Sequence, residues 1–196
     1  MHKKTKKNKN YTFSENRAKC LLSDEWYTPK WIIDDLKSVR QIVLDPFGSL
    51  KSAVGAKVTW IYPEKNGLLD DWNADANPYE YGIVFSNPPF SMKGEFTEHW
   101  VRQTPTFSAP NTLITHVAIL PAKTEQPWFG KMLQHSDAAV FFKGRVAYDR
   151  LAGDEVVKGP QPPMGSVLFI RGEDAAGVCS SFEKHGAVVK LRRYRP

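Results

Sequence analysis

The residues best suited to chemistry are Ser86-Asn87-Pro88-Pro89-Phe90, which directly follow the apolar run Tyr81-Gly82-Ile83-Val84-Phe85. The apolar run predicts a buried strand. Proline fixes φ and donates no N–H, and the residue before each proline is held in extended geometry. We therefore expect a stiff turn at the carboxyl end of the strand, where open α/β sheets bind ligands. An amide, free carbonyls and an aromatic ring at one point suit a flat substrate with an exocyclic amino group.

The plain alternative is a strand that ends at prolines with Phe90 packed in the core, because proline commonly ends strands and begins turns. The complete Asn-Pro-Pro-aromatic string after five apolar residues favours the catalytic interpretation. It resembles the catalytic motif of amino methyltransferases, which transfer a methyl group from S-adenosylmethionine to a nitrogen atom. Enzymes that act on adenine N6, cytosine N4 and protein glutamine share this motif, so it leaves the substrate open.

Around this turn, apolar strands alternate with short helices along the chain. Thr28 and Pro29 predict an N-cap and a first helical position, and residues 29–39 then show one mostly apolar helical face. Further helices are predicted over residues 50–56, 95–102 and 127–134. Strands are predicted over residues 41–44, 57–62, 82–86, 113–120, 138–142, 165–170 and 187–191. This alternation predicts an α/β fold with a mostly parallel sheet and helices on both faces.

Two stretches, near residues 92–111 and 147–164, are predicted to carry long loops. Long loops in a compact domain are often functional, so we expect these to grip and read the substrate. The alternative is that they are solvated surface loops. Residues 21–196 are predicted to form one domain, and residues 1–20 a basic tail without fixed structure.

Positive charge gathers at both ends of the chain. The formal net charge is +6, with five lysines in the first ten residues and four basic residues in the last seven. These ends are either solvated tails or tethers that attract phosphate. No apolar run approaches the roughly 18 residues of a membrane span, and the Lys-rich start does not resemble a signal peptide. We therefore expect no membrane partner.

The cysteines and histidines give no sign of a disulfide framework or a metal site. Cys20 and Cys179 are few and far apart, which fits a reducing, cytoplasmic compartment. None of the five histidines stands at metal-ligand spacing from either cysteine, so we expect no metal. The glycine-rich signatures of nucleoside triphosphatases and dinucleotide enzymes do not occur either.

Residues after the first two strands could hold a methyl donor. Asp45 follows the first predicted strand, and its carboxylate could meet an ammonium group or ribose hydroxyls, while Gly48 lets the backbone approach closely. The alternative is that Asp45 caps a following helix. Glu64 could bind ribose hydroxyls or lie in a surface turn. Asp71 could accept a hydrogen bond from the adenine amino group of the donor, and Asp70 is an equally good candidate.

Further segments follow one another at compatible spacings. They are Asp24-Glu25-Trp26-Tyr27-Thr28-Pro29 with Trp31, Asp45-Pro46, Gly67-Leu68 with Asp71-Trp72, Asn87-Pro88-Pro89-Phe90 with Trp100, Leu120-Pro121-Ala122-Lys123-Thr124 with Trp128-Phe129, Phe142-Lys143-Gly144-Arg145-Val146 and Pro163-Met164-Gly165-Ser166. From about residue 24 to residue 171 the chain thus resembles the bacteriophage DNA N6-adenine methyltransferases of the Dam type. The resemblance implies a Rossmann-like methyltransferase fold, S-adenosylmethionine as donor and adenine in double-stranded DNA as acceptor.

The resemblance also assigns roles by position. It implies that Asn87, Pro88, Pro89 and Phe90 are catalytic, and that Thr28-Pro29, Asp45-Pro46 and Asp71 bind the donor, to which residue chemistry adds Gly48, Glu64 and Asn87. The donor loop is Asp-Pro-Phe-Gly-Ser and the catalytic motif begins with Asn rather than Asp, and both variants occur in related families. Lys123 and Arg145 are candidate contacts to DNA phosphates or bases, or else surface salt-bridge residues.

The mechanism that we expect is direct methyl transfer to an adenine flipped out of the duplex. Phe90 would stack on the base, while the Asn87 side-chain oxygen and the Pro88 carbonyl accept the N6 hydrogens and aim the nitrogen lone pair. The alternatives are a methyltransferase acting on RNA or protein glutamine, and a non-catalytic nucleic-acid-binding protein with the same fold, with a nuclease ranked last. The resemblance further implies a phage- or prophage-encoded enzyme in the cytoplasm of a bacterial host, whose site-specific DNA modification would bear on restriction.

Overall fold

The computed structural model describes residues 26–77, 79–103, 112–152 and 154–191. The predicted basic tail over residues 1–20 and residues 104–111 of the stretch near 92–111 therefore lie outside the described residues. The helices of the described chain are α2 (Lys30–Val39), α3 (Lys93–Gln103), α4 (Pro127–Gln134) and α5 (Ala175–Phe182), with 3₁₀ turns η1 (Trp72–Ala74) and η2 (Phe90–Met92). The strands are β1 (Ile42–Asp45), β2 (Val58–Thr59), β3 (Gly82–Ser86), β4 (Ile114–Pro121), β5 (Ala138–Phe142), β6 (Asp149–Ala152), β7 (Glu155–Lys158), β8 (Ser166–Gly172) and β9 (Gly186–Lys190).

Within the described residues, seven strands form one sheet in the order β2-β1-β3-β4-β8-β5-β9. The pairs β1–β2, β1–β3 and β3–β4 are parallel, whereas β8 runs antiparallel to both β4 and β5, and β9 runs antiparallel to β5. The sheet is therefore mixed, with a parallel half built from the first strands of the chain. All residues of β1, β3 and β4 are buried, as expected for strands covered on both faces.

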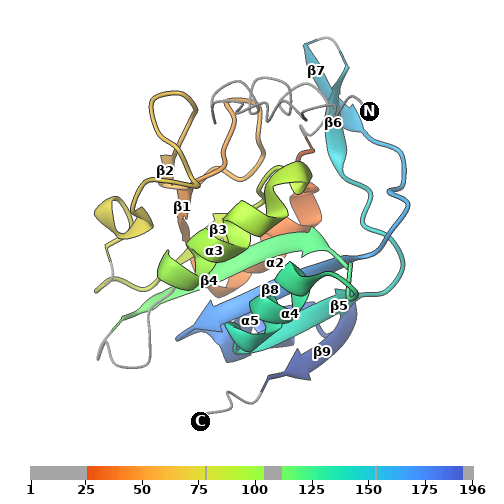
Figure 1. Cartoon of the computed structure of the whole chain (residues 1–196). Helices are drawn as coiled ribbons and strands as arrows, with labels where there is room; N and C mark the ends of the chain where they lie inside the picture. The colour runs from red at the N-terminus through yellow and green to blue at the C-terminus, as the bar shows by residue number, and fades with distance from the viewer. Residues whose placement is uncertain (1–25, 78, 104–111, 153, 192–196) are drawn as a thin grey trace, which may run out of the picture.

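Helices cover both faces of the sheet, as the sequence predicted. Figure 1 shows α3 and α4 in front of the sheet and α2 and α5 behind it. Behind the sheet, Ile32, Ile33 and Leu36 of α2 join one core cluster with the strands and α5. In front, Phe96 and Trp100 of α3 join a second cluster with α4. The sheet is therefore the middle of three layers. Packing of helices on both of its faces keeps the ends of its strands in fixed positions.

The strand order reverses between β1 and β3. From β1 the next strand, β2, lies on one side, whereas β3 and β4 continue on the other. In open α/β sheets, ligands bind in the crevice outside the carboxyl ends of the strands at such a switch point. Asp45 ends β1, and the Asn87-Pro88-Pro89 turn follows β3 at this point.

The stretch 147–164 contains a hairpin, although the sequence predicted only a loop. Strands β6 and β7 pair antiparallel, and the hairpin projects from the body of the protein (Figure 1). One further backbone pair, between Tyr27 and Asp149, ties the base of the hairpin to the segment before α2, with N···O distances of 2.8 and 2.9 Å. The sequence of β6, Asp149-Arg150-Leu151-Ala152, is short and has no clear alternation of apolar and polar residues to mark a strand.

Other predicted elements differ from the structure in informative ways. Residues 50–56 form turns instead of a helix, and β2 is only two residues long, so the expected strand over residues 57–62 ends early. The helix predicted over residues 95–102 is confirmed as α3, which occupies residues 93–103 of the stretch near 92–111. Helix α5 was missed because its sequence contains glycine and two serines, which favour helix weakly. Its packing against α2, through buried Val178 and Phe182, stabilises it instead.

Thr28 is not the N-cap of the first described helix. The N-cap of α2 is Pro29, which makes no side-chain capping hydrogen bond. The side chain of Thr28 is buried, and its Oγ1 has no hydrogen-bond partner among the described residues. Pro29 therefore begins the helix through its fixed φ, and the side chain of Thr28 does not cap it.

Candidate active site

A cavity of about 390 Å³ lies at the switch point of the sheet. This volume falls within the range of small-molecule sites. Its walls come from the segment before α2, the carboxyl end of β1 with the loop behind it, the turn after β3, and one residue of the β6 strand. The lining residues are Trp26, Tyr27, Thr28, Asp45, Phe47, Gly48, Ser49, Leu50, Lys51, Ser52, Val54, Ile61, Tyr62, Asn87, Pro89 and Leu151. Segments far apart in the sequence thus meet at the place that the strand order predicts.

Asn87 is held in one orientation by a backbone carbonyl. Its side-chain Nδ2 donates a hydrogen bond of 2.7 Å to the carbonyl oxygen of Trp26. A carbonyl oxygen can only accept, so the nitrogen of the amide must face Trp26 and the oxygen must face away. Among the described residues, Asn87 Oδ1 has no hydrogen-bond partner. The site therefore presents a fixed, available acceptor at the end of β3.

The segment that orients Asn87 is itself anchored at the base of the hairpin. Tyr27 pairs with Asp149, and Gly159 lies against the ring of Trp26. A Cβ at position 159 would stand 3.0 Å from the Trp26 ring and 2.5 Å from the Tyr148 carbonyl oxygen, so only glycine fits there without movement. The hairpin base thus supports the carbonyl that Asn87 requires.

Asp45 brings a carboxyl group into the cavity from the end of β1. It is 2% exposed, and its Oδ1 accepts one hydrogen bond of 3.1 Å from the backbone N–H of Phe47. Burial raises the pKa of Asp45 to about 7, because a charged carboxylate loses its hydration there, and the single N–H offsets only part of that loss. A cation bound in the cavity would reverse this effect and hold the group ionised.

Gly48 leaves room where a side chain would not fit. A Cβ at this position would lie 2.1 Å from Cγ2 of Thr59, on the strand next to β1, and 3.2 Å from Oδ2 of Asp45. The loop can therefore pass close over the sheet and leave the cavity open beside Asp45. The prediction that glycine permits close backbone approach here agrees with this geometry.

Lys51 is the one lysine or arginine among the described residues that line this cavity. Its Nζ donates to Asp154 at the turn of the hairpin, at 3.0 Å from both the carboxylate and the carbonyl oxygen. The ion pair links the loop after β1 to the hairpin. Among the described residues that line the cavity, Asp45 is the one carboxyl group.

Of the other residues predicted from the sequence, Pro89 lines the cavity, whereas Phe90 does not. Phe90 is half-buried, and its ring packs edge-to-face on buried Tyr148 at 5.5 Å, which fixes its position. Pro29 and Arg145 line a second cavity. Pro46, Pro88 and Lys123 line neither of the two cavities.

The three remaining acidic candidates lie away from the cavity lining. Glu64 is exposed. Asp71 caps η1 by accepting from the Asn73 N–H at 3.0 Å, and Asp70 accepts from the Asn66 N–H at 2.6 Å. Both aspartates are thus used in local turns, and the structure brings neither of them to the cavity wall.

Sequence reasoning assigned no site role to Trp26, Tyr27 or the loop at residues 49–54. Trp26 acts through its carbonyl, which no side-chain pattern reveals. The aromatic pair directly before Thr28 was one signal, because aromatic side chains bury large areas in cores and interfaces. Across the described chain, no group of three or more histidine, cysteine, aspartate or glutamate side chains could hold a metal ion. No helix in the described ranges is long and apolar enough to cross a membrane.

A mixed sheet with a cavity outside the carboxyl ends of its parallel strands, and an amide-proline-proline turn at its wall, defines a ligand-binding α/β protein. The family model described as DNA N-6-adenine-methyltransferase (Dam) matches residues 15–190, and the chain belongs to this family. This confirms the resemblance to Dam-type enzymes and indicates DNA N6-adenine methyltransferase activity. Comparisons with curated proteins and with solved structures found no match.

Proposed function

We propose that this protein transfers a methyl group from S-adenosylmethionine to N6 of an adenine flipped out of double-stranded DNA, within a Rossmann-like methyltransferase fold. The observation that carries the proposal is the fixed amide of Asn87. Its oxygen is available as an acceptor beside a cavity that also holds a buried carboxyl group.

The residues of the cavity suit the donor. Asp45 is buried and has no cationic partner among the described residues, which suits an α-ammonium group, and the cavity beside Gly48 suits a ligand that lies along the loop. Asp45, Gly48 and the Trp26–Thr28 segment would hold the donor, with Pro29 and Pro46 shaping the two backbone segments. Bound there, S-adenosylmethionine would supply an electrophilic methyl group on a sulfonium centre, and the S–CH3 bond that breaks would leave S-adenosylhomocysteine. Glu64 and Asp71 remain candidates for donor contacts only if their loops move toward the cavity.

Asn87 and Pro88 would act on the acceptor nitrogen. The Asn87 oxygen and the Pro88 carbonyl accept hydrogen bonds from the two N6 hydrogens, which concentrates the lone pair on nitrogen instead of in the ring. After the N–CH3 bond forms, the nitrogen loses one of these protons to solvent. This arrangement supplies positioning together with stabilisation of the positive charge that develops on nitrogen. Phe90, braced by Tyr148, supplies a stacking surface for the base. Unpairing the adenine is required because N6 is otherwise hydrogen-bonded inside the duplex.

The test is transfer of a labelled methyl group from S-adenosylmethionine to unmethylated duplex DNA, followed by nucleoside analysis. We expect N6-methyladenine, and we expect it to disappear in Asn87→Ala. Label that enters RNA or protein but not DNA would replace the proposed acceptor. Failure to bind the donor at all would indicate a nucleic-acid-binding protein without catalysis.

A further inference from the structure

A second cavity, of about 450 Å³, lies beside the first and is not used by the proposed transfer chemistry. Its walls come from the start of α2, the end of β5 with the segment that follows it, the base of the hairpin, and His185. The first and second cavities share the Tyr27–Asp149 backbone pair, because Tyr27 lines the first and Asp149 lines the second. A ligand that extends from one to the other would therefore pass along this pair.

The second cavity is rich in positive charge that is not used within the protein. Lys143, Arg145 and Lys158 line it, all three are exposed, and none forms an ion pair among the described residues. By contrast, the ion pairs of the described chain include six other lysines, which are Lys30, Lys51, Lys57, Lys65, Lys131 and Lys184. Asp149 is the one carboxylate in this lining. Because three cationic side chains and one carboxylate line this cavity, it favours an anionic ligand.

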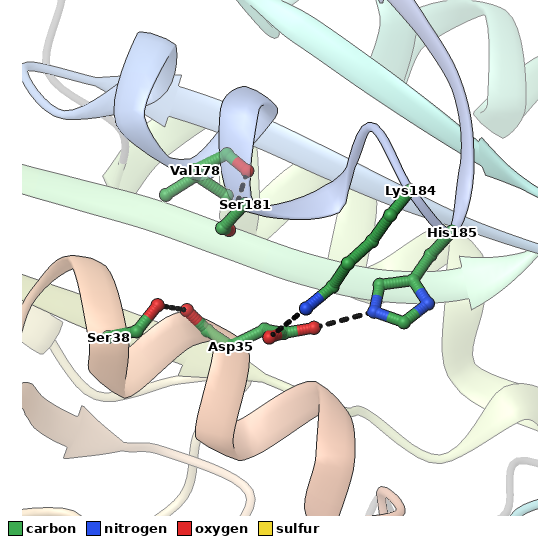
Figure 2. A network of polar contacts seen from close by, with 6 residues as sticks. All are labelled: Asp35, Ser38, Val178, Ser181, Lys184 and His185. Atoms are coloured by element: carbon green, nitrogen blue, oxygen red, sulfur yellow. Dashed lines mark hydrogen bonds and ion pairs between the residues drawn. The ribbon is translucent and has the colours of Figure 1, made fainter.

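One wall of the same cavity is aromatic. Trp31 is 38% exposed, and its ring packs edge-to-face on Phe142 at 5.8 Å and lies 4.4 Å from the ring of His185. Asp35 fixes that histidine, since it accepts from His185 Nε2 at 2.7 Å and also pairs with Lys184 at 2.9 Å (Figure 2). The wall thus presents a braced, partly exposed indole next to three cations.

A groove that combines unpaired cations with an exposed aromatic ring has the chemistry of a nucleic-acid strand site, where cations hold phosphates and the ring stacks on a base. We infer that the second cavity binds the DNA strand beside the target adenine. Lys143, Arg145 and Lys158 hold its phosphates, and Trp31 stacks on one unstacked base. That the polyanion is DNA rests on the proposed function. Arg145, which the sequence offered as a single candidate contact, is here one of several residues that form the site.

The test measures DNA binding by fluorescence anisotropy over a salt series between about 50 and 200 mM. The probe is a labelled duplex with one mismatched adenine, which favours extrusion of that base. We expect Lys143→Ala, Arg145→Ala and Lys158→Ala each to lower affinity several-fold and to reduce the slope of log affinity against log salt by about 1. Trp31→Ala is expected to lower affinity about tenfold without a change in slope, and Trp31→Phe to retain most of it.

The matched control is Lys57→Ala. Lys57 is an exposed lysine immediately before β2 and lines neither cavity, so its substitution should leave affinity and slope unchanged. In parallel, calorimetric titration with S-adenosylmethionine measures donor affinity at the first cavity. Every variant should bind the donor with wild-type affinity.

Wild-type DNA affinity and slope in the triple variant K143A/R145A/K158A would overturn the inference and leave the proposed function intact. Binding of deoxyadenosine monophosphate that is lost in the triple variant, with DNA affinity unchanged, would also overturn it, in favour of a free-nucleotide site. Failure of the proposed function would appear separately, as absent donor binding or absent methyl transfer in the wild-type protein.

Discussion

The side chain of Asn87 is bound to the backbone carbonyl of Trp26 across 61 residues of sequence, at 2.7 Å. This hydrogen bond settles which end of the amide faces the protein, so the oxygen is the group offered to a substrate. Trp26 is in turn held by the hairpin base through Gly159 and the neighbouring Tyr27–Asp149 pair. The candidate catalytic amide therefore depends on three segments that are distant in the chain.

Asn87→Ala should abolish methyl transfer while leaving donor binding intact. The substitution removes the acceptor that aims the N6 nitrogen, and loss of one such electrostatic contact costs about 100-fold or more in rate. The measurement is single-turnover transfer to DNA, with donor affinity determined by calorimetry on the same samples. Asn77→Ala is the matched control, because Asn77 is an exposed asparagine that only supports a local turn.

Asn87→Asp separates orientation from acceptor capacity. A carboxylate keeps the acceptor but cannot donate to the Trp26 carbonyl, so we expect activity between those of the alanine variant and the wild type. Wild-type rates in both variants would refute a role for this side chain in the transfer step.

Asp45→Asn should change how stability depends on pH. Burial raises the pKa of Asp45 from 3.8 to about 7, so the folded protein keeps a proton that the unfolded chain has lost. The stability of the wild type therefore falls as pH rises through the window from about 4 to about 7, and the full cost is present above it. Asparagine has no proton to lose and can still accept from Phe47 N–H. Its free energy of unfolding, relative to the wild type, should rise by a few kcal/mol across this window in urea titrations.

The same carboxyl group should link donor binding to pH. An ammonium group beside Asp45 favours the ionised form, so donor binding should release a proton and strengthen as pH rises toward about 7. Calorimetry in buffers of different ionisation enthalpy measures the proton release directly. Asp45→Asn should bind the donor more weakly and with no proton release. Equal proton release by the variant and the wild type would remove Asp45 from the donor site.

Gly48→Ala should destabilise the protein and weaken donor binding, because the new methyl group would overlap Cγ2 of Thr59. Overpacking of this kind costs about 1–3 kcal/mol of unfolding free energy. Thr59→Ser removes the Thr59 methyl group that the new alanine side chain would overlap. The double variant with Gly48→Ala and Thr59→Ser should therefore recover most of the lost stability. Thermal unfolding and donor titration of both single variants and the double variant form a double-mutant cycle, which measures the coupling between the two positions. A double variant no better than Gly48→Ala would mean that the close approach is not the cause.

Gly159→Ala should slow transfer more than it weakens donor binding. Its Cβ would press on the Tyr148 carbonyl and the Trp26 ring, and a shift of Trp26 would move the partner of Asn87. Steady-state kinetics with DNA should show a lower kcat at nearly unchanged donor affinity. Parallel falls in both quantities would instead indicate a general loss of folding at the hairpin base.

Gly130→Ala is the matched control for the Gly159 variant. Gly130 lies inside α4, and a Cβ there meets nothing within 4 Å. The substitution should raise the free energy of unfolding by up to about 1 kcal/mol, because alanine favours helix over glycine. Transfer rates should match the wild type.

Much of the fold follows from local patterns in the sequence. The buried run before Asn87, the apolar strands over residues 114–121 and 138–142, and helix α4 with Pro127 in its first turn were all predicted within a residue or so. Each of these elements has its own signal, since continuous apolar residues predict a buried strand and a proline at the start favours a helix. Hairpin β6–β7 and helix α5 lacked such signals and form because of what they pack against.

The sequence by itself determined the motif chemistry: an amide, two prolines and an aromatic ring after one strand, and a carboxyl group after another. Only the tertiary structure decided which of the candidates share a cavity. It brought Asp45, Gly48 and Asn87 together because parallel strands end at one edge of the sheet, and it placed Asp70 and Asp71 in local turns. It also supplied the Trp26 carbonyl, since a backbone atom gains a role only from the segments that folding places beside it.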